Sequence, residues 1–155
     1  MSLAWCLARS SYRALDGEGA RRAGCRWNSK GVAVVYTSST LSLAALELLV
    51  HVDPANAPDD FVALGIEVPD DPLPETVAHA DLPHAWRAIE PPATCRAVGD
   101  QFVARGETLD LSIPLVIIPL ERNLLINPQH ADMFPLQAVH EAPFRFDPRL
   151  LHAAA

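Results

Sequence analysis

Residues 24–51 read GCRWNSKGVAVVYTSSTLSLAALELLVH, and this stretch combines a loop, a strand and a helix. Residues 32–37 form a β-branched run that predicts a buried strand. Hydroxyl side chains follow at positions 38–40 and can cap a helix over residues 41–52, which ends before Pro54. We therefore expect one strand, cap and helix unit around which the rest of the domain is built.

Glu47 is the feature of this unit that most needs an explanation. No other Asp, Glu, Lys or Arg occurs between Lys30 and Asp53. A helix that is apolar on most faces is normally buried, and a buried carboxylate is costly unless it is hydrogen-bonded, paired with a cation or placed in a cleft. Glu47 therefore requires either a partner or a function.

Three further side chains are expected near Glu47. His51 follows it by one helical turn on the same face, while Arg26 and Tyr36 lie in the loop and strand that precede the helix. In a shared cleft, an arginine can hold a phosphate, a tyrosine can stack on a ring, and a carboxylate can stabilise positive charge. This set suits a dinucleotide whose glycosidic bond breaks through an oxocarbenium-like state. The residue types leave a purely structural ion pair between Arg26 and Glu47 equally open.

Composition limits the classes of protein that remain possible. The chain has 155 residues, 50% of them hydrophobic and 20% charged, which indicates one folded domain. It has no apolar run of about 20 residues and no secretory signal, so we expect a cytoplasmic protein without a membrane partner. The net charge of -7 argues against nucleic acid as a partner. Half of the twelve basic residues lie in the first thirty positions, either as a site for a small anionic ligand or as a solvated surface.

Cysteine spacing and familiar motifs supply no cofactor site. The three cysteines are far apart and lack a CxxC spacing, which argues against a zinc site or a disulfide framework. The phosphate-binding glycine loops, the HExxH motif and the GxSxG motif are all absent from the sequence. No metal is therefore expected.

The remaining elements are assigned from local pattern. Strands are expected at residues 3–8, 61–68, 115–118 and 124–126, and helices at 82–86 and 93–105 with Gly106 as the C-cap. Residues 16–19 and 70–75 read as loops, and residues 144–151 as a last strand and helix end.

The order of five segments resembles one known family nearly end to end, over residues 1–152. These segments are DGEGARRAGCRWNSKG, VVYTSSTLSLAALELLVH, LPHAWR, IPLVIIPLERNLLINPQH and FRFDPRL, and the family is that of the RES-domain toxins of bacterial type II toxin–antitoxin systems. The resemblance implies a single α/β (α+β) domain whose central mixed sheet resembles the ADP-ribosyltransferase fold. It also implies NAD as the substrate, without a metal.

The activity implied by the resemblance is that of a growth-inhibiting toxin. It would cleave the nicotinamide–ribose bond of NAD and pass ADP-ribose to a protein, as a mono-ADP-ribosyltransferase, or to water or phosphate, as an NAD glycohydrolase or phosphorylase. The family's catalytic arginine, tyrosine and glutamate match Arg26, Tyr36 and Glu47. The residues expected to contact NAD are Arg26, Asn28, Tyr36, Ser38 and His51. The implied partner is a cognate antitoxin with an Xre-like helix-turn-helix domain, whose end could plug the cleft.

One position departs from the family pattern. The family has a serine after a proline where this chain has Leu115, and Ser112 lies at an odd offset that would point it to the opposite face of a strand. Loss of a hydroxyl beside the nucleotide could weaken hydrolysis or favour transfer to a chosen acceptor. It also leaves a second hypothesis, a non-catalytic nucleotide- or partner-binding module with a degenerate pocket.

Overall fold

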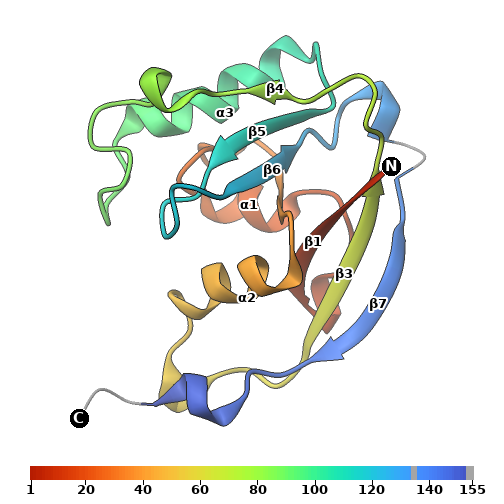
Figure 1. Cartoon of the computed structure of the whole chain (residues 1–155), viewed down its shortest axis with the longest axis vertical. Coiled ribbons are helices and arrows are strands. Elements are labelled where there is room, and N and C mark those ends of the chain that lie inside the picture. Colours follow the sequence, from red (N-terminus) through yellow and green to blue (C-terminus); the bar gives the residue numbers. More distant parts are fainter. Residues whose placement is uncertain (134–135, 153–155) are drawn as a thin grey trace.

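A computed structural model describes residues 1–133 and 136–152 of the chain. Within these residues one mixed sheet has the strand order β4-β5-β6-β2-β1-β3-β7 (Figure 1). Among the strands of the described residues, only β4 and β5 pair in parallel. The strands are β1 (Ser2–Arg9), β2 (Val35–Ser38), β3 (Phe61–Val68), β4 (Glu75–Thr76), β5 (Asp110–Pro114), β6 (Arg122–Ile126) and β7 (Ala138–Phe144). The helices are α1 (Glu18–Ala23), α2 (Leu41–Leu49) and α3 (Ala93–Arg105). The expected single α/β domain with a mixed sheet is confirmed.

The strand pairing is shortest in the middle of the sheet, between β1 and β2. β1 pairs with β3 over eight residues, whereas it pairs with β2 only at Trp5 opposite Ser38. Figure 1 shows β5 and β6 under α3 in the upper part of the molecule, β1, β3 and β7 descending on the right, and α2 below α1 to the left of β1 and β3. The two halves of the sheet therefore diverge at the junction of β1 and β2.

Two hydrophobic clusters form the core, and the first of them joins the two halves of the sheet. One packs side chains of β1, β2, β3 and β6, and the other packs α3 against β5, β6 and the loop that precedes β2. Gly99 of α3 lies directly on that loop, since a Cβ at this position would be 1.8 Å from the carbonyl oxygen of Trp27. The loop that carries Arg26 is thereby pressed against a rigid helix.

Segments with a long, clear pattern fold as expected. β3 spans residues 61–68, α3 spans residues 93–105, and Gly106 caps α3 in the left-handed conformation with φ 59°. β2 begins at Val35 rather than at residue 32, and α2 ends at Leu49 rather than at residue 52. Thr40 caps α2, because its Oγ1 accepts a hydrogen bond from the Leu43 amide at 3.1 Å.

Two expected elements are wrong. Residues 115–118 are not a strand but the tip of the hairpin between β5 and β6, which the Leu115 amide closes by donating to the Glu121 carbonyl. Residues 82–86 form turns after the short 3-10 helix His79–Asp81 rather than a helix. Both runs are short and flanked or interrupted by proline, which removes a backbone donor and disfavours a regular element.

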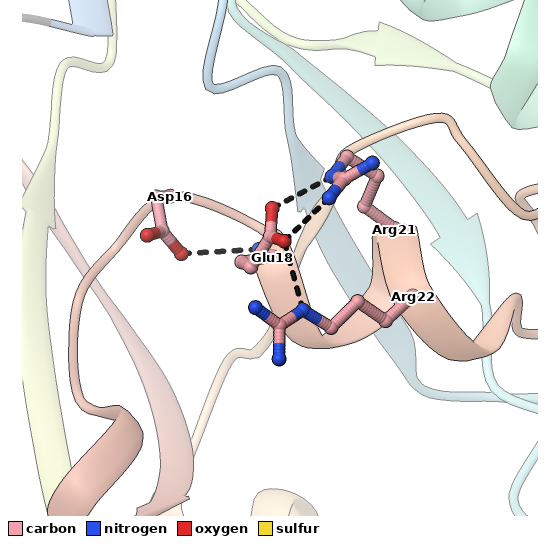
Figure 2. Close-up of polar contacts among 4 residues, drawn as sticks. All are labelled: Asp16, Glu18, Arg21 and Arg22. Atoms are coloured by element: carbon pink, nitrogen blue, oxygen red, sulfur yellow. Dashed lines mark hydrogen bonds and ion pairs between the residues drawn. The ribbon is translucent and has the colours of Figure 1, made fainter.

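α1 lies where the sequence suggested a loop. Figure 2 shows the reason: the Glu18 carboxylate accepts hydrogen bonds from Arg21 at 2.6 and 2.7 Å and from Arg22 at 2.9 Å, while Asp16 accepts from the Glu18 amide. Such pairs three and four residues apart support a helix turn. None of the helices in the described part of the chain is long and apolar enough to cross a membrane.

Candidate functional site

A pocket of about 340 Å³ opens where the two halves of the sheet diverge. Its wall includes Trp5 and Ser38, the single pair that joins β1 to β2, together with one face of α2 and the tip of the β5–β6 hairpin. Five of the six residues that the sequence predicts for the site line this pocket, namely Arg26, Tyr36, Ser38, Glu47 and His51.

Glu47 contributes a partly buried carboxylate to the pocket. Its Oε2 accepts a hydrogen bond from Asn123 Nδ2 at 2.7 Å. Burial raises the pKa of Glu47, while the bond from Asn123 and the nearby charges of His51 and Arg26 act in the opposite direction. The pocket thus holds one carboxylate whose protonation depends on its immediate neighbours.

Asn123 of β6 is a site residue that the sequence analysis missed. Its Oδ1 accepts a hydrogen bond from Ser38 Oγ at 2.8 Å, and both residues are buried. Because the amide oxygen is occupied by Ser38, the amide NH₂ is turned toward Glu47. The sequence carried little signal for it, because Asn123 follows Arg122 at the start of the strand and precedes its apolar residues.

Arg26 lines the pocket without contacting Glu47 directly. Its Nη1 donates to the carbonyl oxygens of Trp86 at 2.9 Å and Ala88 at 2.6 Å. Among the ion pairs of residues 1–133 and 136–152, none joins Arg26 to Glu47. Arg26 therefore anchors the loop of residues 82–92 with one nitrogen, and the structural ion pair with Glu47 is not formed.

The side chains of Tyr36 and Asn28 are joined by a hydrogen bond, and of the two only Tyr36 lines the pocket. The Tyr36 hydroxyl donates to Asn28 Oδ1 at 2.6 Å and accepts from the Trp27 amide at 3.2 Å. Burial raises the pKa of Tyr36 well above its ordinary value, so this hydroxyl stays protonated and fixed while the ring lines the pocket. Asn28 is completely buried, and its Nδ2 donates to the carbonyl oxygens of Ala20 and Val32. The structure does not bring Asn28 to the pocket with the other predicted residues.

The position of the family serine also lies outside the pocket. Leu115 is 1% exposed and packs into the interior, while its neighbours Pro114, Val116 and Ile117 form an apolar part of the wall. Ser112 Oγ accepts a hydrogen bond from Arg122 Nε at 2.7 Å and does not line the pocket. Neither residue supplies a hydroxyl to a ligand there.

The arrangement combines a carboxylate, a guanidinium, an aromatic ring and an oriented amide around one small cavity. Such a set can hold an anionic ligand and stabilise positive charge that develops on a sugar. In the described part of the chain, no three His, Cys, Asp or Glu side chains gather as a metal-ligand group.

The fold and the pocket define a small α/β domain with one carboxylate, Glu47, placed in a cavity of about 340 Å³. A family model described as the RES domain matches residues 3–147, and the chain belongs to this family. It is similar to a Toxin Res from Yersinia enterocolitica, with 38% identity over 135 residues that cover 86% of this chain and 88% of that protein. It is also similar to a Prs ADP-ribosylating toxin from a Sphingobium species, with 38% identity over 142 residues that cover 90% of this chain and 88% of that protein.

A solved structure shares the fold. The toxin–antitoxin complex MbcT-MbcA of M. tuberculosis contains a chain that superposes with a TM-score of 0.74 at 20% sequence identity. The match covers 97% of this chain and 86% of that chain. The resemblance seen in the order of the sequence segments is thereby confirmed at the level of family and of fold.

Proposed function

We propose that this protein is a toxin that breaks the nicotinamide–ribose bond of NAD and transfers the ADP-ribose to an acceptor. The observation that carries the proposal is the Glu47 carboxylate, which Asn123 orients in the pocket that Arg26 and Tyr36 also line. The relative from Sphingobium supports it, because that protein is named an ADP-ribosylating toxin.

The bond that breaks joins the ribose C1′ to the ring nitrogen of nicotinamide. The bonding electron pair leaves with the nicotinamide, which departs as a neutral base, and positive charge develops on the ribose. Glu47 stabilises this oxocarbenium-like state and accepts a hydrogen bond from the ribose 2′-hydroxyl. Asn123 holds the carboxylate in place, and the Tyr36 ring provides a flat surface for stacking.

The acceptor attacks the vacated face of the ribose. A protein side chain gives a mono-ADP-ribosylated target, water gives ADP-ribose, and phosphate gives a phosphorylated ADP-ribose. The apolar wall of Pro114, Val116 and Ile117 offers no side-chain group that could hold an attacking water. This feature favours transfer over hydrolysis.

A protein that consumes a central cofactor must be restrained in its own cell. We infer that a cognate antitoxin of the Xre-like helix-turn-helix type covers this pocket. The likeness to a chain from a toxin–antitoxin complex supports the existence of such a partner. Co-expression with the adjacent gene should restore growth. The complex purified from these cells should release no nicotinamide from NAD.

The direct test is the release of nicotinamide from NAD by purified protein, measured by chromatography. Wild-type protein should release it with time, and Glu47→Gln should not, because the neutral amide cannot stabilise the cationic ribose. Glu67→Gln is the matched control, since Glu67 is an exposed glutamate on β3 away from the pocket. A folded Glu47→Gln protein that consumes NAD at the wild-type rate would disprove the mechanism.

The competing function is a nucleotide-binding module without turnover. Leu115 favours this function, because it stands at the family serine position and supplies no hydroxyl to the pocket. Calorimetry with NAD would then show saturable heat, and chromatography would show no nicotinamide. Products formed with and without cell lysate separate the acceptors: a labelled protein band indicates transfer, and free ADP-ribose indicates hydrolysis.

A further inference from the structure

A second cavity, of about 650 Å³, adjoins the site pocket and shares Cys25, Arg26 and His51 with it. Three cationic side chains line this cavity, namely Arg26 and Lys30 from the loop before β2 and Arg96 from the first turn of α3. Glu90 is the one carboxylate among its lining residues. We refer to this cavity as the basic pocket.

The cations of the basic pocket differ from most other lysines and arginines because they form no ion pair with a carboxylate of the described residues. Seven of the twelve lysines and arginines form ion pairs with carboxylates among the described residues, whereas Arg26, Lys30 and Arg96 form none there. The chain carries a net charge of -7 and still gathers these three cations, with the single carboxylate of Glu90, around one cavity. Such a site attracts an anion with several negative oxygens.

A third cavity, of about 890 Å³, adjoins the site pocket and shares Cys6, Leu7, Cys25 and Tyr36 with it. Its cations are already neutralised, because Arg13 pairs with Glu141 and Arg22 pairs with Glu18 (Figure 2). Asp16 and Glu18 add negative charge to its wall. Charge therefore favours the basic pocket over this larger cavity as a place for phosphate groups.

The size of the site pocket favours a substrate that extends beyond it. Small-molecule sites span about 300–1,000 Å³, so a cavity of about 340 Å³ is at the small end while a dinucleotide is a large ligand. Arg26 lines both cavities, so one side chain borders the two. Ile89, which is 96% exposed, and Pro91 offer apolar surface in the basic pocket against which a base can lie.

We propose that the basic pocket binds the phosphate groups of the ADP half of NAD, with Lys30 and Arg96 as their ligands. The nicotinamide ribose then lies beside Glu47 in the site pocket, and Arg26 spans the two. The inference rests on the proposed function and adds the path of the substrate and two specificity residues.

The test is the affinity for ADP-ribose, measured by calorimetry in phosphate-free buffer. Lys30→Ala and Arg96→Ala should each weaken binding about tenfold or more, and the dependence of the Kd on salt should fall. Arg149→Ala is the matched control for loss of a surface arginine, and its Kd should equal that of the wild type, because Arg149 pairs only with Asp147. Absence of ADP-ribose binding by the wild type would overturn the proposal.

Arg22→Ala tests the third cavity as the alternative path. Its Kd should also equal that of the wild type, since this arginine is held by Glu18. If Arg22→Ala weakened ADP-ribose binding while Lys30→Ala and Arg96→Ala did not, the proposal would be wrong.

A free phosphate ion could occupy the basic pocket in place of the phosphate groups of NAD. If the basic pocket served an attacking phosphate instead, Lys30→Ala and Arg96→Ala would change the dependence of nicotinamide release on phosphate and leave ADP-ribose affinity intact, which would overturn the proposal. Failure of the proposed function gives a different result. A wild type that releases no nicotinamide, yet binds ADP-ribose through Lys30 and Arg96, would leave the basic pocket as the binding site.

Discussion

Asn123 on β6 donates a hydrogen bond to Glu47 on α2 at 2.7 Å, and this contact links one half of the sheet to the helix that faces the other half. Ser38 fixes the amide from behind, because its hydroxyl donates to Asn123 Oδ1. The orientation of the proposed catalytic carboxylate therefore depends on a buried amide that is 76 residues away in the sequence.

Removal of this amide should change the pH dependence of NAD cleavage. The bond from Asn123 lowers the pKa of Glu47 against the effect of burial, so Asn123→Ala should raise that pKa further. Because the mechanism needs the anion, the acidic limb of the kcat/KM profile should move to higher pH. Ser38→Ala should move it in the same direction by less. An acidic limb that stays in place in both variants would show that Asn123 does not act through Glu47.

Substitution of Arg26 should destabilise the loop of residues 82–92. Arg26→Ala removes two hydrogen bonds to the carbonyls of Trp86 and Ala88, which should lower the free energy of unfolding by about 2–3 kcal/mol. Urea denaturation measures this loss. The double variant with Glu47→Gln should be additive within about 0.5 kcal/mol, since no ion pair joins the two side chains. A larger coupling energy would restore the structural ion pair as an explanation.

The Tyr36 hydroxyl and ring should have separable roles. Tyr36→Phe leaves Asn28 Oδ1 without its donor in a buried place, so the free energy of unfolding should fall by about 1–3 kcal/mol. The KM for NAD should stay near that of the wild type because the ring that lines the pocket remains. Tyr36→Ala should lose both stability and affinity. A Phe variant with wild-type stability and a greatly raised KM would assign the hydroxyl, and not the ring, to the ligand.

Asp110 should make the protein less stable at high pH. It is 4% exposed, and burial raises its pKa to about 6 from an ordinary value of 3.8. A raised folded-state pKa means that the native protein holds this proton more tightly. The stabilisation is therefore present below about pH 4 and is lost as the pH rises through about 6. Asp110→Asn should raise the Tm at pH 8 and lose this advantage at pH 4, whereas the exposed control Asp81→Asn should not show this difference. A lower Tm at pH 8 would contradict the assignment.

Gly99 should be intolerant of a side chain. A Cβ there would overlap the Trp27 carbonyl oxygen, so Gly99→Ala must push α3 away from the loop that carries Arg26. We expect a loss of about 3 kcal/mol in unfolding free energy together with loss of NAD cleavage. Gly19→Ala in α1 is the matched control, because nothing lies within 4 Å of its Cβ position, and it should be neutral or stabilising. Equal stability of the two variants would refute the close contact.

The sequence by itself determined the elements whose patterns are long and local. β3 and α3 follow from their apolar runs and from Gly106, and the unit of residues 24–51 follows from a β-branched run, the capping hydroxyls at positions 38–40 and an apolar helix. The isolation of Glu47 in that unit pointed to the site without knowledge of the fold. These features depend on residues within a few positions of one another, which is why a pattern can predict them.

Only the tertiary structure decided which groups meet at the site. Asn123 is 76 residues from Glu47, and it reaches the carboxylate because the register of β2 and β6 places it opposite Ser38. The partners of Arg26 are carbonyl groups 60 and 62 residues away, which excluded the ion pair that residue types left open. The inward direction of Leu115 depends on the hairpin tip that the sequence analysis took for a strand. Register and packing join distant segments, and no local pattern encodes them.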